Sequence, residues 1–139
     1  MLLGINFWAV LVCGVIAMVV GFVWYGPLFG RTWMKIVGAT ELDEARRAEM
    51  QKKAGPLYFI QFVLVLFQLF VLGHMTGYTG SSGVVSALWA WAGFVMPTIA
   101  ASSMWNNDST KVSWTRFFIQ AGYQLICFVI FGFILGVWH

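Results

Sequence analysis

Four long apolar stretches, separated by shorter polar segments, make up most of this 139-residue chain. The apolar stretches cover residues 4–25, 57–75, 84–105 and 115–138. A helix of about 20 apolar residues crosses the hydrocarbon core of a bilayer, which is roughly 30 Å thick. The pattern therefore predicts an all-α integral membrane protein with four transmembrane helices, in a single membrane domain over residues 1–139.

A longer polar insertion, residues 27–55, separates the first two stretches. The dipeptides Gly26-Pro27 and Gly55-Pro56 are predicted to end helices, because proline disfavours helical geometry in the residue before it. Residues 27–37 mix apolar and basic side chains, which predicts a short amphipathic helix in the membrane interface. Residues 40–54 are predominantly hydrophilic and predict a separate charged helix in water, before the second span begins.

Small side chains recur at helical spacing in the first and fourth stretches. Four of them stand at every fourth position of the first stretch, which places them on one helix face. Such residues let membrane helices approach closely, although chance in a helix rich in alanine, glycine and valine is the alternative. The predicted packing positions are Ala9, Cys13, Ala17, Gly21, Gly132 and Gly136.

Composition excludes several classes of protein. Only 9% of the residues are charged, whereas a soluble domain needs about 25% to cover its surface. The net charge of +3 is too small to indicate nucleic-acid binding. No Asp or Glu lies inside the four stretches, which argues against a proton-coupled transporter built on an intramembrane carboxylate.

The sequence predicts neither a catalytic site nor a metal site. No pairing of nucleophile and base is readable, so we do not expect an enzyme; an active site would have to use interfacial groups such as Tyr25, His74 or Asn106. As a metal ligand, His74 would have His139 as its sole histidine partner. We therefore expect no metal, no cofactor and no nucleic-acid partner.

The basic residues predict the orientation in the membrane. All eight lie in or beside the first and third connections, whereas the second connection and the N-terminal tail hold none. The positive-inside rule then predicts cytoplasmic first and third connections, with both termini outside. These residues are Arg31, Lys35, Arg46, Arg47, Lys52, Lys53, Lys111 and Arg116.

A spaced pattern links the two halves of the chain. Gly21-Phe-Val is followed, twelve residues after the glycine, by Trp33, and Gly93-Phe-Val is followed at the same interval by Trp105. We interpret this as two tandem parallel repeats of two helices each. Coincidence is the alternative, because glycine, phenylalanine and valine are common in this chain.

The junction after the first stretch has the most distinctive pattern. It reads Gly-x-x-Trp-Tyr-x-Pro, continues to a glycine and a tryptophan, and follows an asparagine near the start of the chain. Together with four membrane helices, it resembles the bacterial family called domain of unknown function 1761. The resemblance implies a small four-helix protein of the bacterial inner membrane and implies no activity. The matching residues are Asn6, Gly21, Trp24, Tyr25, Pro27, Gly30 and Trp33.

Two functional hypotheses fit these patterns. The favoured one is a non-catalytic interaction protein, either a self-associating bundle (a homo-oligomer) or an accessory subunit of a larger membrane complex, joined through its small-residue stripes. The alternative is a small pore or carrier for a neutral or lipid-like molecule. The first expects the intramembrane glutamines to pair with each other or with backbone, and the second expects a passage beside them.

Any ligand site is predicted in the layer where the first helix meets the cytoplasm. Gln61 and Gln68 are seven residues apart and share one helix face, and Gln120 and Gln124 share another. Tyr123 stands beside the second pair. The candidate ligand residues are Trp24, Tyr25, Gln61, Gln68, Gln120 and Gln124.

Overall fold

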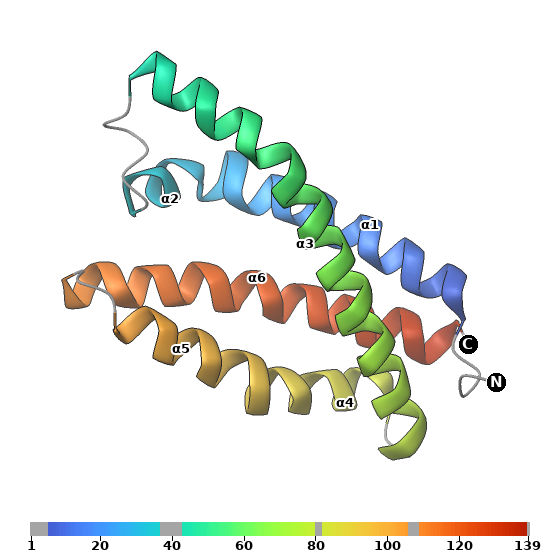
Figure 1. Ribbon diagram of the computed structural model, residues 1–139. Coiled ribbons are helices and arrows are strands. Elements are labelled where there is room, and N and C mark those ends of the chain that lie inside the picture. The colour runs from blue at the N-terminus through green and yellow to red at the C-terminus, as the bar shows by residue number, and fades with distance from the viewer. Residues whose placement is uncertain (1–5, 37–42, 80–81, 106–108, 139) are drawn as a thin grey trace.

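The computed structural model describes residues 6–36, 43–79, 82–105 and 109–138, and its regular structure is helical throughout these ranges (Figure 1). The π-helical turns η1 and η3 interrupt the α-helices. In chain order the elements are α1 (Phe7–Val23), η1 (Trp24–Leu28), α2 (Gly30–Ile36), α3 (Glu44–Thr79), α4 (Gly83–Ala90), η3 (Trp91–Val95), α5 (Met96–Met104) and α6 (Thr110–Val137).

Within the described residues, four helical segments are long and apolar enough to cross a membrane. The first joins α1 to η1, and the third joins α4, η3 and α5. The prediction of an all-helical protein with four apolar spans is confirmed, and the spans are those of a multi-pass membrane protein. They are Phe7–Leu28, Glu44–Thr76, Gly83–Met104 and Thr110–Val137.

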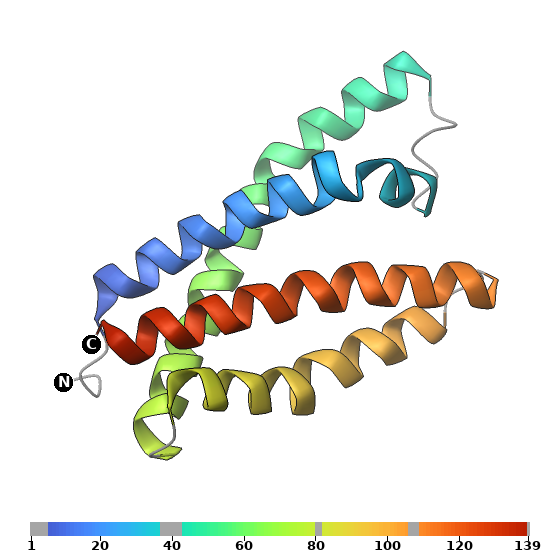
Figure 2. The same ribbon diagram turned by 180° about the vertical axis from the view of Figure 1, so that it is seen from behind.

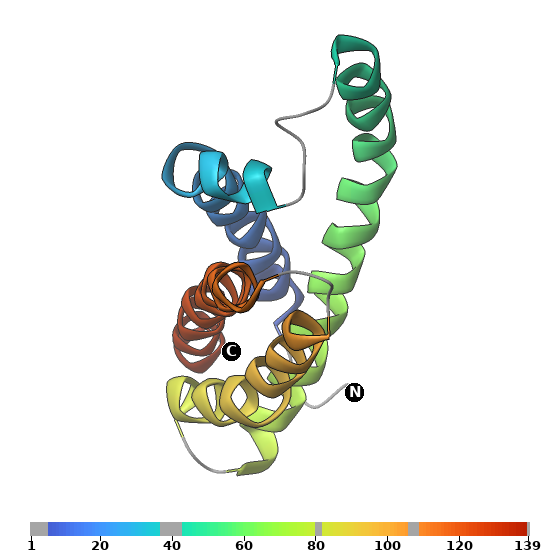
Figure 3. The same cartoon turned by 90° about the vertical axis from the view of Figure 1, so that its left-hand side faces the viewer.

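Successive spans run in opposite directions, so both chain ends lie at the same end of the bundle (Figure 1). The last helix, α6, is central and packs on α1, α3, α4 and α5. α3 crosses the other spans obliquely, in front of them in Figure 1 and behind them in Figure 2. Figure 3 shows α3 along one side of the layer that α1, α6 and α4 form.

The two ends of the bundle differ in chemistry. One carries the chain termini, and the other carries basic side chains such as Arg31 and Lys35 on α2 and Lys111 on α6. We call the parts nearer these ends the termini half and the basic half. The termini half comprises residues 7–17, 65–76, 83–90 and 127–137, and the basic half comprises residues 18–36, 43–64, 91–105 and 109–126.

In the termini half, α4 and α6 are in backbone contact. A Cβ atom on Gly132 would lie 2.5 Å from the carbonyl oxygen of Gly83, and one on Gly136 would lie 3.3 Å from the Gly83 nitrogen. Larger residues would force the helices apart. The glycine pair of α6 therefore packs against α4 of the same chain.

The small-residue stripe of α1 also faces the interior. Ala9 and Cys13 are fully buried and Ala17 is 1% exposed. They belong to a core cluster that includes Leu69 of α3 and Phe131 of α6. The stripe is therefore covered by helices of its own chain.

The prediction of a separate charged helix over residues 40–54 is wrong. α3 starts after Asp43, whose Oδ1 accepts a hydrogen bond from the backbone nitrogen of Arg46 at 2.9 Å, and it passes through Gly55-Pro56 without a break. Residues 40–42 lie outside the described ranges.

Solvation explains why Gly55-Pro56 does not end α3. Pro56 removes one hydrogen bond from the helix. Its neighbours on α3 are exposed, so water and lipid headgroups at the membrane surface reach the freed carbonyl. The 36 residues of α3 reach about 54 Å at about 1.5 Å per residue, so the charged first turns extend beyond the hydrocarbon core.

The first helix also continues past its predicted end at Gly26-Pro27. The N–H of Phe29 donates to the carbonyl of Trp24 at 3.0 Å, so the turn widens into a π-helix that accommodates Pro27. The break comes at Phe29, whose φ of −119° and ψ of 11° are not helical. α2 follows in a new direction (Figure 1).

The third span has its irregularity next to Pro97. The π turn η3 precedes Pro97, and the Thr98 hydroxyl donates to the carbonyl of Phe94 at 2.6 Å. The widened turn and the hydroxyl compensate for the hydrogen bond that proline cannot make.

Candidate functional site

A partly open cavity of about 660 Å³ lies in the basic half, and all four spans contribute to its wall. Its volume falls in the range of small-molecule sites, about 300–1,000 Å³. Its lining side chains are aromatic, apolar or polar, and none is ionised at neutral pH. Trp33 of α2 and Ile99 of α5 are half-buried in this wall.

The first span and α6 form the floor of the cavity. Phe22 and Gly26 of the first span are exposed, whereas the other lining residues of these two elements are buried or half-buried and lie deepest in the bundle. The floor residues are Met18, Gly21, Tyr25, Gln120, Tyr123 and Gln124.

The rim of the cavity lies mainly on α3 and α5. Tyr58 and Gln61 of α3 line the cavity and are exposed, as are Thr98 and Ser102 of α5. In Figure 1 the N-terminal half of α3 diverges from α5, and the two helices approach only near α4. The cavity therefore opens between α3 and α5.

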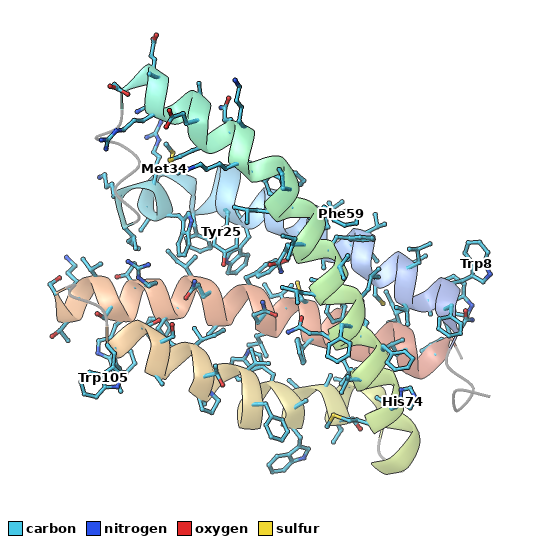
Figure 4. The ribbon with its side chains drawn as sticks, viewed as in Figure 1. Trp8, Tyr25, Met34, Phe59, His74 and Trp105 are labelled. Atoms are coloured by element: carbon cyan, nitrogen blue, oxygen red, sulfur yellow. The ribbon has the colours of Figure 1, made fainter. Side chains whose placement is uncertain are left out.

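Tyr123 joins the two elements that form the floor of the cavity, α6 and α1. Its hydroxyl donates to the carbonyl oxygen of Ala17 at 2.8 Å, and a Cβ atom on Gly21 would lie 3.2 Å from that hydroxyl. The ring of Tyr123 meets Tyr25 edge-on at 5.5 Å, and Tyr25 meets Trp33 in the same way at 4.9 Å. Figure 4 shows Tyr25 between the first span and α6. These three rings give the cavity a continuous aromatic wall.

Three of the four candidate glutamines line the cavity, namely Gln61, Gln120 and Gln124. Within the described ranges, their amides form no hydrogen bond with another residue. Gln68 is exposed, two turns further along α3, and does not line the cavity. The structure therefore separates Gln61 from Gln68, which the sequence placed on one face.

Trp24, also a candidate ligand residue, has a packing role instead. Its indole Nε1 donates to the carbonyl of Ile119 at 2.8 Å, and its ring contacts Phe29 at 4.9 Å. At the other π turn, the indole of Trp91 donates to the carbonyl of Ala121 at 3.1 Å. Each π turn is thus fastened to α6 by the tryptophan at its first position.

His74 lies in the termini half, away from the cavity (Figure 4). Its Nδ1 is 2.8 Å from the carbonyl oxygen of Phe70, and the two rings contact each other at 4.4 Å. The imidazole is thus held by its own helix. His139 and Asn106 lie outside the described residues.

A family model described as a protein of unknown function, DUF1761, matches residues 8–136. The chain belongs to the DUF1761 family. This confirms the resemblance seen at the junction after the first span. A search of curated proteins and a search of solved structures found no match.

The DUF1761 junction residues build one wall of the cavity. Tyr25 and Trp33 line it, and Gly21 leaves room for the floor beneath. A Cβ atom on Gly30 would lie 3.1 Å from the carbonyl oxygen of Tyr25, so glycine lets α2 fold back there. Asn6 acts elsewhere: its Oδ1 caps α1 by accepting from the backbone nitrogen of Trp8 at 3.0 Å.

Several lining residues of this DUF1761 chain were missed by sequence reasoning. Tyr58 stands three residues before Gln61, on the same helix face, which was a usable signal. Thr98 and Ser102 are four residues apart and share one helix face, which was a second usable signal. The other missed residues are Met18, Phe22, Gly26 and Ile99.

Proposed function

We propose that this DUF1761 protein binds a small uncharged molecule in the cavity of the basic half and acts as a membrane carrier for it. The observation that carries the proposal is the cavity itself, which has an aromatic wall and three glutamines in its lining. Ligand sites in proteins are typically apolar concavities with a few polar groups that orient the ligand.

The amides support a ligand more than a purely structural role. Buried polar groups are normally hydrogen-bonded to protein or water, and polar side chains that line a cavity are available to orient a ligand. Gln120 and Gln124 are half-buried and have no hydrogen-bonding partner among the described side chains and backbone groups. The interaction-protein hypothesis expects them to pair within the protein, whereas the carrier hypothesis expects them to face a cavity.

The proline positions support a carrier rather than a permanently open pore. All three prolines of the chain lie beside lining residues: Pro27 follows Gly26, Pro56 precedes Tyr58 by two residues, and Pro97 precedes Thr98. Interrupted helices around a binding site are typical of transporters that alternate their access, and π turns are frequent at functional sites. On the side of the termini half, the cavity ends at the packed core cluster.

Orientation and internal symmetry form part of the same proposal. The positive-inside rule supports a cytoplasmic basic half and external termini in a bacterial inner membrane. The shared direction of α1 and α4–α5, and of α3 and α6, is what two-helix repeats require, as it is in any bundle of alternating spans. However, Gly21 faces Tyr123, while no described side chain lies within 4 Å of a Cβ built on Gly93, so the two glycines have different surroundings.

Native mass spectrometry of the extracted protein tests the proposal. We expect a small molecule bound to the wild-type chain after incubation with a membrane lipid extract. Ile99→Trp fills the cavity and should lower occupancy about tenfold or more. The matched control is Ile126→Trp, because Ile126 is 38% exposed on the lipid-facing side of α6 and does not line the cavity. Equal occupancy in both variants, or no bound molecule in the wild type, would contradict the proposal.

A further inference from the structure

We infer that the ligand is an uncharged lipid with a hydroxyl-bearing head, and that it enters the cavity between α3 and α5 from the leaflet at the basic half. This inference rests on the proposed function and goes further by naming the ligand class and its route. It follows from the position of the cavity mouth, the depth of that mouth in the membrane, and the chemistry of the lining.

The mouth lies between two membrane spans. The exposed lining residues of α3 are Tyr58 and Gln61, and those of α5 are Thr98 and Ser102. Both helices are among the segments apolar enough to span a bilayer. An opening between two spans faces lipid, so a molecule already dissolved in the bilayer reaches it by lateral diffusion.

The depth of the mouth matches the upper part of a lipid. Thr98 lies six residues before Met104, where the third span ends, which corresponds to roughly 9 Å along the helix axis. Gln61 lies four residues after Leu57, where α3 becomes apolar, which corresponds to roughly 6 Å. This depth lies just inside the hydrocarbon core, so a lipid bound here places an uncharged head beside the amides while its chains continue toward the bilayer centre.

The absence of charge in the lining selects an uncharged head. The basic side chains of α2, Arg31 and Lys35, are exposed and do not line the cavity. A phosphate placed in the cavity would lose its hydration without gaining a cationic partner, which is strongly unfavourable. Phospholipids are therefore poor candidates for this site.

The amides select a head with hydroxyl groups. Each glutamine offers a carbonyl acceptor and an NH₂ donor, and Gln61, Gln120 and Gln124 all line the cavity. A hydroxyl group both donates and accepts, so it satisfies both ends of an amide. A quinone only accepts hydrogen bonds and would leave the amide carbonyl oxygens without donors.

The remaining lining suits the hydrocarbon part of such a lipid. Phe22 and Tyr58 contact each other with ring centroids 5.6 Å apart, and both are more than half exposed at the mouth. Met18 and Ile99 extend this apolar surface inward. A lipid chain that leaves the cavity here passes over aromatic and aliphatic side chains into the bilayer.

Binding of defined lipids to the detergent-solubilised full-length protein, followed by native mass spectrometry, tests this inference. The probes are dioleoylglycerol, monoglucosyl-dioleoylglycerol, decylubiquinone and dioleoyl phosphatidylglycerol. We expect at least one of the two hydroxylated neutral lipids to bind about tenfold more tightly than the phospholipid or the quinone. The tighter of the two identifies whether glycerol or sugar hydroxyls are recognised.

Two variants of α3 provide a matched pair. Gln61→Leu removes an amide that lines the cavity, and Gln68→Leu removes an exposed amide that does not. We expect the first to weaken binding of the hydroxylated lipid about fivefold, the usual scale for losing one or two hydrogen bonds, and the second to leave it unchanged.

Equal effects of the two variants, or tighter binding of phosphatidylglycerol or decylubiquinone, would overturn the inference. If Ile99→Trp displaces a bound molecule but neither hydroxylated lipid binds, the proposed function stands and the assigned ligand class is wrong. If no probe binds and the wild-type chain carries no molecule, both are wrong.

Discussion

In the termini half, α4 and α6 meet backbone to backbone at Gly83 and Gly132, and the surrounding space is filled by alanine, leucine and phenylalanine. In the basic half, the first three spans carry prolines, π turns interrupt the first and third, and all four spans surround a cavity of about 660 Å³. Membrane helices associate through close packing, so the termini half contributes most to holding the bundle together. This lets the basic half keep an unfilled space lined by polar groups.

The largest expected effect is at the glycine contact of the termini half. Gly132→Ala places a methyl group 2.5 Å from the Gly83 carbonyl oxygen, where rigid backbone has to move. We expect the free energy of unfolding in detergent to fall by about 2 kcal/mol. The control is Gly93→Ala, whose Cβ has no described neighbour within 4 Å and which should leave stability unchanged or raise it by up to about 1 kcal/mol. Equal losses would remove the contrast between the halves.

The next effect concerns the tryptophans that fasten the π turns to α6. Trp24→Phe removes the 2.8 Å hydrogen bond to the Ile119 carbonyl together with part of the ring's packing. We expect a loss of about 1–2 kcal/mol in the same unfolding titration. Trp89→Phe is the control, because Trp89 is 75% exposed. If both variants unfold like the wild type, the indole contact does not stabilise the first π turn.

A smaller effect is expected at the floor of the cavity. Tyr123→Phe keeps the ring but removes the 2.8 Å hydrogen bond to the Ala17 carbonyl. Hydrogen bonds between membrane helices contribute about 0.6 kcal/mol on average, so we expect a loss of that order. Tyr58→Phe, on the exposed rim, should lose nothing measurable. A larger loss at Tyr58 would mean that the rim, and not the floor, stabilises the basic half.

The smallest effect on stability is expected at the lining amides themselves. Gln61→Leu and Gln124→Leu replace groups that have no hydrogen-bonding partner among the described residues. We expect unfolding free energies within about 0.5 kcal/mol of wild type, or slightly above it, because site residues are often not optimal for stability. A loss of more than about 2 kcal/mol would assign these amides to structure instead of ligand binding.

The four spans could be predicted from the sequence because the apolar length of a span is a local property of the chain. Small-residue spacing also predicted that Gly132 and Gly136 pack closely, but their partner Gly83 stands at the start of another span, and no local pattern connects them. Local rules failed at Gly26-Pro27 and Gly55-Pro56. There, a π turn and solvent exposure compensate for the proline, and both depend on the surrounding structure.

The candidate site was only partly predictable for a similar reason. Gln61 and Gln68 are equivalent by helical spacing, yet α3 crosses the bundle obliquely, so only Gln61 reaches the cavity. Trp24 and Tyr25 are adjacent in sequence, but the π turn directs Trp24 to the Ile119 carbonyl and Tyr25 to the cavity wall. The crossing angle and the turn are tertiary features, which explains why the sequence grouped residues that the fold separates.

The contrast between an open basic half and a closed termini half is tested most directly by thiol reactivity at two serines. Ser102→Cys introduces a thiol on the cavity rim, and Ser86→Cys introduces one on α4, where Ser86 is 4% exposed. The native thiols of Cys13 and Cys127 are buried and serve as internal controls. With methyl methanethiosulfonate, a small neutral reagent, and intact-mass detection of the folded protein in lipid nanodiscs, we expect rapid modification in the Ser102→Cys variant alone. Equal modification at Ser86→Cys and Ser102→Cys, or an unreactive thiol at the rim, would contradict the account.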